Sequence, residues 1–192
     1  MPRQTLQMKR WKRVEYERLV DKGVFEPGDR IELIDGLLLV SEPQSSPHYT
    51  AIRLVERVLA RAFGEGWDVR TQAPIALDDA SEPEPDVAVV PGGPDDYARA
   101  HPPRPVLTVE VAESSLALDR LRKGSLYARA GLADYWVLNL IDRVLEVYRE
   151  PVPDSASPFG WRYARRDVLD AATHGTPLAA PGSNVLVSNL LP

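Results

Sequence analysis

The sequence predicts an α/β or α+β domain in which helices flank a mixed β-sheet. Segments with helical and strand periodicity alternate along the chain, in the order helix, hairpin, helix, strands, helix, strands. Two of the strands, at 87–90 and 106–111, are mainly apolar, which indicates a sheet that is covered on both faces. The chain has 192 residues, a length that suits one domain over residues 1–192.

Three helices are expected from apolar residues spaced three and four apart. The first runs over about 9–22 and ends at Gly23, because glycine readily adopts the positive φ of a helix C-terminus. The second follows a proline-containing loop and continues to about Phe63. The third covers about 116–130 and ends at Gly131.

The strands are expected as short apolar runs between turn residues. Asp35-Gly36 lies between two such runs, and this dipeptide favours a tight hairpin. From Pro151 onward the chain reads as irregular, with strands expected only near 161–164 and 184–187. The remaining strands are expected at 67–72, 87–90, 106–111, 135–140 and 144–149.

Composition excludes several classes of function. The chain has no cysteine, so it forms no disulfide and no thiolate zinc site, and it suits the reducing cytoplasm. No apolar run is long enough for a transmembrane helix, so no membrane association is expected. The net charge of −5 is unfavourable for nucleic-acid binding, although a hydrolase that holds divalent metals needs carboxylates.

Two strands carry a carboxylate where a buried strand should have none. Asp86 opens the strand at 87–90, and Glu110 interrupts the apolar strand at 106–111. An ionised carboxylate in an apolar strand costs several kcal/mol unless it is paired, hydrogen-bonded or bound to a metal. Asp86 has an alternative interpretation as a residue that starts a strand and caps a turn. Glu110 is harder to explain in structural terms, because its neighbours indicate burial.

Lys123 lies on the face of the third helix that is expected to pack against the sheet. The alternative is an exposed pair with Asp119, four residues earlier, which stabilises a helix by only about 0.3–0.5 kcal/mol. We expect Asp86 and Glu110 to hold Mg²⁺ or Mn²⁺, with the backbone carbonyl of Val111 as a further ligand. Lys123 would then orient a metal-activated water or stabilise developing negative charge during phosphodiester hydrolysis.

Five ordered blocks over residues 30–149 resemble the Uma2 family of restriction-endonuclease-like proteins. The blocks are Glu32-Leu-Ile-Asp-Gly36, Ser46-Pro-His48, Pro83-Glu-Pro-Asp-Val-Ala-Val89, Val109-Glu-Val111, and Lys123 through Tyr127-Ala-Arg-Ala-Gly131 to Asp134-Tyr-Trp136. The resemblance implies a restriction-endonuclease-like fold, a mixed sheet flanked by helices, with its core at about 30–149.

That family is similar to the PD-(D/E)XK nucleases, in which Pro-Asp on one strand is followed by Glu-X-Lys on the next. Pro85-Asp86 and Glu110 match this pattern, but Ala112 stands where the lysine is expected. In the Uma2 pattern the following helix supplies the lysine, which is Lys123 here. The resemblance also implies that Glu32 is an additional acidic group near the metal.

Two features of the resemblance leave questions for the structure. His48 falls within a family motif without an assigned role, and a single histidine before a helix is more often structural. After the Val-Glu-Val strand the family pattern usually has Ser-Pro-Ser. This chain reads Ala112-Glu113-Ser114-Ser115 instead, so the loop before the third helix lacks the proline.

The resulting hypothesis is a Mg²⁺-dependent DNA endonuclease. It is expected to act as a homodimer, because two symmetric sites can cut both strands of a duplex. One alternative is a non-catalytic module with the same fold that acts in binding or assembly, since fold does not determine function. Another is a metal-dependent hydrolase of a different phosphoester, because the carboxylates recognise the metal and not the substrate.

Overall fold

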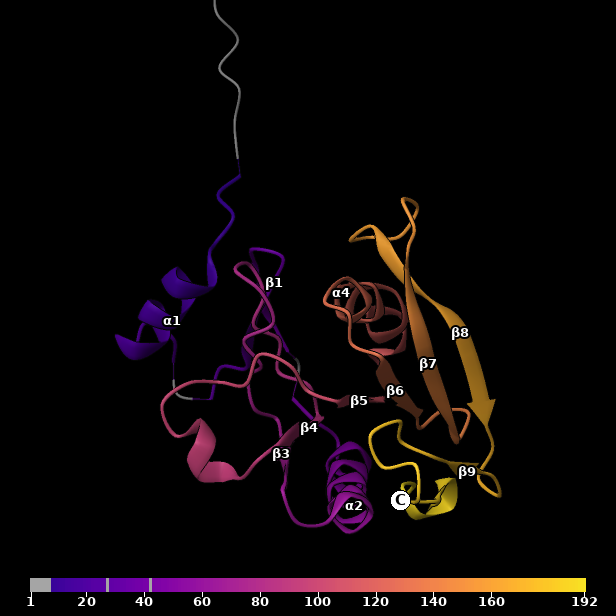
Figure 1. Cartoon of the computed structure of the whole chain (residues 1–192). Helices are drawn as coiled ribbons and strands as arrows, with labels where there is room; N and C mark the ends of the chain where they lie inside the picture. The colour runs from indigo at the N-terminus through magenta and orange to yellow at the C-terminus, as the bar shows by residue number, and fades with distance from the viewer. Residues whose placement is uncertain (1–7, 27, 42) are drawn as a thin grey trace, which may run out of the picture.

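The computed structural model describes residues 8–26, 28–41 and 43–192 (Figure 1). The predicted domain includes residues 1–7, which lie outside the described residues, and a single domain over 1–192 stays a prediction. The helices are α1 (Arg13–Asp21), α2 (Ser46–Phe63), α3 (Leu116–Leu118) and α4 (Gly124–Arg129), with 3-10 helices η1 (Pro94–Tyr97) and η3 (Val187–Asn189) and the π-helix η2 (Asp119–Lys123). The strands are β1 (Ile31–Ile34), β2 (Leu37–Val40), β3 (Trp67–Thr71), β4 (Val87–Pro91), β5 (Leu107–Ala112), β6 (Asp134–Asn139), β7 (Val144–Pro153), β8 (Trp161–Leu169), β9 (His174–Gly175) and β10 (Val185–Leu186).

The six-stranded sheet has the order β3-β4-β5-β6-β7-β8, and only the β5–β6 pair is parallel. The predicted mixed sheet is therefore confirmed. The parallel pair requires a crossover connection, which the helical segment 116–129 provides between β5 and β6. β4 and β5 are adjacent and antiparallel with Val87 opposite Val109, and this register continued by one residue places Asp86 opposite Glu110.

Helices cover both faces of this sheet, as the apolar strands predicted (Figure 1). On one face α2 packs against odd-numbered residues of β4 and β5, among them Val89 and Val109. On the other face α4 packs against even-numbered residues such as Ala88 and Ala112. Since side chains alternate along a strand, Asp86 and Glu110 share the face that α4 covers.

The hairpin of β1 and β2 forms at the predicted turn, where Ile34 pairs with Leu37. Asp35 and Gly36 both have positive φ, of 48° and 79°. A Cβ at Gly36 would lie 2.8 Å from the Cβ of Arg10, so this position needs glycine for space as well as for conformation. Helix α1, which packs nearby, begins at Arg13 and not at residue 9, because the Lys12 N–H donates to Glu15 Oε2 at 2.9 Å.

The strand predicted near 161–164 is confirmed, and β10 lies within the range predicted at 184–187, but the prediction that the chain is otherwise irregular after Pro151 is wrong for 151–153 and 165–169. β7 continues to Pro153, and β8 pairs with it along a nine-residue strand, Trp161–Leu169. β8 is the edge of the sheet, and four of its nine residues are charged, namely Arg162, Arg165, Arg166 and Asp167. Only Tyr163 within it is buried. An edge strand with this pattern lacks the apolar alternation that identifies a strand in a sequence.

A fully buried carboxylate, that of Glu146 in β7, connects the sheet to the helical segment η2. Arg120 of η2 donates to both carboxylate oxygens, Arg166 of β8 donates to Oε2 from Nε at 3.2 Å, and the Tyr148 hydroxyl donates to Oε2 at 2.6 Å. Burial on its own would raise the pKa of Glu146, but these donors lower it to about 2. The charged form is therefore the one that the fold stabilises.

We expect Glu146→Gln to destabilise the protein at pH 7 by about 2–4 kcal/mol, because it leaves Arg120 and Arg166 without their buried counter-charge. A carboxyl with a lowered pKa stabilises the fold above its unfolded pKa of about 4.3, and this contribution disappears as the pH falls toward 2. Urea denaturation between pH 7 and pH 2 should show the variant and the parent converging in acid. The control is Glu150→Gln, an exposed residue at the same strand. A constant difference between parent and Glu146→Gln at every pH would contradict the prediction.

Candidate active site

A cavity of about 540 Å³ lies between the β1–β2 hairpin, the start of α2, the strands β4 and β5, and the segment 113–123. Its lining includes two basic residues, Arg30 and Lys123. The acidic residues in the lining are Glu32, Glu84, Asp86, Glu110, Glu113 and Asp119. All four predicted acidic or basic site residues therefore line one cavity, in which carboxyl groups outnumber basic groups.

Asp86 and Glu110 are joined through the backbones of their neighbouring strands. The Val111 N–H donates to Asp86 Oδ2 at 2.8 Å, and the Asp86 N–H donates to Glu110 Oε2 at 3.4 Å. Only 7% of Asp86 and 2% of Glu110 is exposed. Asp86 directly precedes β4, so it starts a strand as the alternative interpretation has it, and its role in metal binding stays a prediction. Val111 contacts Asp86 through its amide, and the role of its carbonyl as a metal ligand stays a prediction.

Lys123 points into the cavity toward both of its predicted neighbours. Its Nζ lies 3.2 Å from Glu110 Oε1 and 3.4 Å from Glu32 Oε1, and 7% of the residue is exposed. The alternative of an exposed pair with Asp119 is wrong, because both residues are buried. Lys123 is the last residue of the π-helix η2, and π-helical turns often occur at functional sites.

The loop before the third helix lacks the proline of the family pattern, but Lys123 still reaches Glu110 and Glu32. Glu113 and Ser115 in that loop both line the cavity. Glu113 Oε2 accepts a hydrogen bond of 2.5 Å from the Ser45 hydroxyl, which ties the loop to the start of α2. A side-chain contact thus holds this loop at the cavity.

A neutral donor and a charged donor contact the same carboxylate oxygen of Glu110. The Tyr127 hydroxyl donates to its Oε1 at 2.8 Å, beside the Lys123 ammonium. Burial raises the pKa of Glu110 well above its usual value; Lys123 opposes this effect, while the charges of Asp119, Asp86 and Glu32 add to it. The crowding of carboxylates thus adds to the effect of burial on Glu110.

The pKa of Lys123 is raised well above its usual value. Burial on its own would lower it, but the carboxylates of Glu110 and Glu32, with smaller contributions from Asp119 and Asp86, reverse the direction. The ammonium is therefore charged at every pH at which the protein would work. It neutralises part of the negative charge of the cavity.

Asp119 is a residue of this cavity that sequence reasoning did not assign to the site. It is 2% exposed, and its Oδ2 accepts a 2.6 Å hydrogen bond from the Ser115 hydroxyl. Burial raises its pKa to about 6, although Lys123 and the hydrogen bond from Ser115 act in the opposite direction. The signal that could have found it is the spacing of four residues to Lys123, which places both on one helical face.

His48, the residue without an assigned role, lies at the cavity beside Asp86. Its Nε2 is 3.3 Å from Asp86 Oδ1. Its backbone N–H donates to Oγ of Ser45, the residue that caps the N-terminus of α2, so the cap fixes the position of the histidine. His48 therefore contacts Asp86 Oδ1 from the start of α2, while the Val111 N–H of β5 contacts Oδ2.

The cavity offers two carboxylates on neighbouring strands, Asp86 and Glu110, which would hold a cation together with water. Among the described residues, no three Asp, Glu or His side chains are arranged to hold one metal ion. Lys123 lies between Glu32 and Glu110, and the backbone N–H of Glu84 donates to Glu32 Oε2 at 3.1 Å. Mg²⁺ commonly binds through one or two carboxylates and keeps several waters, which Asp86 and Glu110 can satisfy.

The chain matches one protein family over most of its length. The family model Uma2, described as "Putative restriction endonuclease", matches residues 13–178. The chain belongs to the Uma2 family. The match extends beyond the 30–149 core that the motifs indicated, because it includes α1, β8 and β9.

The fold of this Uma2 protein is shared with a solved nuclease-like protein. The crystal structure is described as that of a putative nuclease belonging to DUF820 from Anabaena variabilis ATCC 29413. Its sequence is 16% identical, the TM-score is 0.66, and the match covers 89% of this chain and 96% of that chain. This likeness establishes the restriction-endonuclease-like fold. No curated protein matches the chain significantly.

Within the part of the chain that the structure describes, no helix is both long and apolar enough to cross a membrane.

Proposed function

We propose that this Uma2 protein is a metal-dependent endonuclease that hydrolyses phosphodiester bonds of DNA. The observation that carries the proposal is the position of the Lys123 ammonium, which lies 3.2 Å from Glu110 and 3.4 Å from Glu32 in an open cavity beside Asp86. A cavity with a buried lysine and several carboxylates matches the chemistry of phosphodiester hydrolysis. A pure binding module has no need to bury this set of charges.

Asp86 and Glu110 would hold Mg²⁺ or Mn²⁺, with the carbonyl of Val111 proposed as a further ligand. Such an ion, when bound, lowers the pKa of a water and neutralises charge on a phosphate. Lys123 orients the attacking water or stabilises the negative charge that develops on the phosphate. Glu32 holds the lysine from the opposite side, and Tyr127 fixes one oxygen of Glu110.

The charge of the cavity supports a particular order of binding for metal and nucleic acid. Six carboxylates face two basic residues in the lining, so the cavity on its own repels a phosphate. We therefore propose that divalent cations bind before nucleic acid. We further propose a homodimer, in which each site cuts one strand of the duplex. We also propose a cytoplasmic location, because the chain has no cysteine.

A substrate panel tests this function. The full chain is incubated with supercoiled plasmid, with single-stranded RNA and with bis(p-nitrophenyl) phosphate, in Mg²⁺ or Mn²⁺ and in EDTA. We expect nicked and linear plasmid only in the presence of the metal. Turnover of the small phosphodiester alone would identify a hydrolase of another phosphoester. Absence of turnover on all three, with Mg²⁺ shown to bind, would overturn the proposal in favour of a non-catalytic module.

A further inference from the structure

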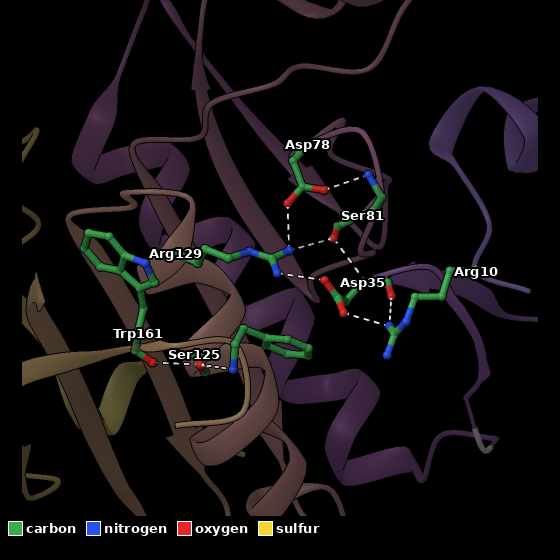
Figure 2. A network of polar contacts seen from close by, with 9 residues as sticks. Arg10, Asp35, Asp78, Ser81, Ser125, Arg129 and Trp161 are labelled. Carbon is green, nitrogen blue, oxygen red and sulfur yellow. Dashed lines mark hydrogen bonds and ion pairs between the residues drawn. The ribbon is translucent and has the colours of Figure 1, made fainter. Parts of the chain in front are cut away.

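A network of ion pairs outside the cavity is centred on Arg129, the last residue of α4 (Figure 2). Its Nη1 donates to Asp35 Oδ1 at 2.7 Å, and its Nη2 donates to Asp78 Oδ2 at 2.9 Å. The same Nη2 lies 3.4 Å from Ser81 Oγ. One guanidinium thus joins three segments that are far apart in the sequence.

The two segments that Arg129 contacts are themselves bound to each other. Asp35 is the turn residue of the β1–β2 hairpin, and its N–H donates to Ser81 Oγ at 3.1 Å. The Gly36 N–H donates to the Ala80 carbonyl at 2.7 Å. The hairpin tip and the 78–81 turn therefore form one unit, and Arg129 attaches this unit to α4.

The aromatic ring of Phe159 holds the guanidinium from a further side. The Arg129 Cζ lies 5.2 Å from the centre of that ring, within the range of a cation–π contact. The Phe159 N–H donates to Ser125 Oγ at 3.0 Å, and the Ser125 hydroxyl donates to the Trp161 carbonyl at 2.7 Å (Figure 2). Residues of α4 thus fix the ring as well as the guanidinium.

The hairpin and the helical segment also meet inside the cavity, at Glu32 and Lys123. Glu32 lies three residues before Asp35 on the hairpin, and Lys123 lies six residues before Arg129 on the helical segment. Within the described part of the chain, the polar contacts between β1–β2 and residues 116–129 are the Lys123–Glu32 and Arg129–Asp35 ion pairs. The first brings two buried charges together, and the second connects the same two segments outside the cavity.

We propose that Arg129 is a positioning residue, which sets the separation of the hairpin from the helical segment and so places Glu32 against Lys123. This inference rests on the proposed nuclease function for its effect on activity, and on the network alone for its effect on geometry. Arg129 suits the task because two separate nitrogens of its planar fork bind Asp35 and Asp78, which fixes both contacts in one rigid geometry that the single point charge of a lysine does not impose. Without it, Glu32 and Lys123 would no longer be held at their present distance.

The absence of cysteine makes a direct distance measurement straightforward. Cysteines introduced at Val40, on the hairpin, and at Leu121, on the helical segment, would carry spin labels, since these side chains are 71% and 62% exposed. Pulsed electron paramagnetic resonance on the full chain without metal then gives the hairpin–helix distance distribution. We expect a narrow distribution in the parent and a broadened or shifted one in Arg129→Gln.

The matched control is Arg122→Gln. Arg122 is exposed on the same helical segment and lies 5.7 Å from the centre of the same Phe159 ring, but it has no ion pair with Asp35 or Asp78. We expect its distance distribution and its activity to equal those of the parent. Asp35→Asn breaks the ion pair from the hairpin side and tests the inference if Arg129→Gln fails to fold. Asparagine also tolerates the positive φ at this position.

Plasmid cleavage supplies the second measurement. A displacement of about 1 Å in a catalytic group can cost about 100-fold in rate, so we expect kcat to fall by about 10- to 100-fold in Arg129→Gln with KM unchanged. An unchanged distance distribution in both Arg129→Gln and Asp35→Asn would overturn the inference. A changed distribution with parental kcat would overturn it as well. If the parent itself cleaves nothing, the proposed function fails, while the distance measurement still decides whether Arg129 sets the hairpin–helix separation.

Discussion

Replacing Lys123 by methionine should lower plasmid cleavage by about 10²–10³-fold while Mg²⁺ binding persists. Methionine keeps an unbranched side chain in the cavity but removes the charge 3.2 Å from Glu110 and 3.4 Å from Glu32. The carboxylates that are proposed to hold the metal remain. The loss should therefore appear in kcat, and isothermal titration with Mg²⁺ should still show binding.

Lys123→Arg should fail as well, because a planar guanidinium does not replace a compact ammonium between two buried carboxylates. Arg122→Met is the control, since it removes an exposed positive charge from the neighbouring position. We expect this control to cleave at the parental rate. Parental cleavage by either Lys123 variant would show that the lysine has no catalytic role and that its ion pairs are structural.

Replacing Asp86 by asparagine should abolish the stabilisation of the fold by Mg²⁺. A ligand that binds only the folded state raises its stability by about 1.4 kcal/mol when its concentration is ten times its Kd. For a chain of this size we expect Tm of the parent to rise by about 3–5 °C in millimolar Mg²⁺ or Mn²⁺. Asparagine keeps the shape of the side chain but supplies a neutral and weaker oxygen ligand, so the rise should disappear.

Differential scanning calorimetry across a Mg²⁺ titration measures this effect. Asp79→Asn serves as the control, because Asp79 is exposed and carries the same change of charge. Its Tm should rise with Mg²⁺ as in the parent. If Tm of the parent stays unchanged across millimolar Mg²⁺ and Mn²⁺, the cavity does not bind these cations as proposed.

The parts of the fold that follow simple periodicity could be predicted from the sequence. The Asp35-Gly36 hairpin, the presence of strands β4 and β5, and the burial of Glu110 all follow from local patterns of apolar and turn residues. Lys123 could be placed for the same reason, because the helical stripe that contains it is determined by residues close by in sequence.

The parts that depend on distant partners could not be predicted. The sequence predicts a strand only near 161–164, and the continuation of β8 to Leu169 depends on its pairing with β7. In the sequence, Glu146 has the pattern of an exposed strand residue. Its burial depends on Arg120 and Arg166, which lie at least 20 residues away in the chain. Arg129 meets Asp35 across 94 residues of sequence, and no local pattern indicates such a contact.

Among the residues of the cavity, some could likewise be predicted from local patterns and others could not. Asp86 and Glu110 stood out because each carboxylate adjoins an apolar strand. Asp119 did not, because a carboxylate four residues before a lysine has an ordinary interpretation as an exposed helical pair. Asp119 is buried because the π-helix η2 turns both Asp119 and Lys123 toward the interior.

The most direct test of the proposed metal-dependent nuclease activity is the rate of supercoiled-plasmid cleavage by Glu110→Gln beside the parent, in 10 mM Mg²⁺ and in EDTA. Glutamine preserves the volume of this buried side chain and can still accept from Tyr127, but it cannot serve as an anionic metal ligand. We predict metal-dependent cleavage by the parent and a loss of at least about 100-fold in the variant, with circular dichroism showing the same fold. Cleavage by Glu110→Gln at the parental rate, or parental cleavage that persists in EDTA, would contradict a metal-dependent reaction at Asp86, Glu110 and Lys123.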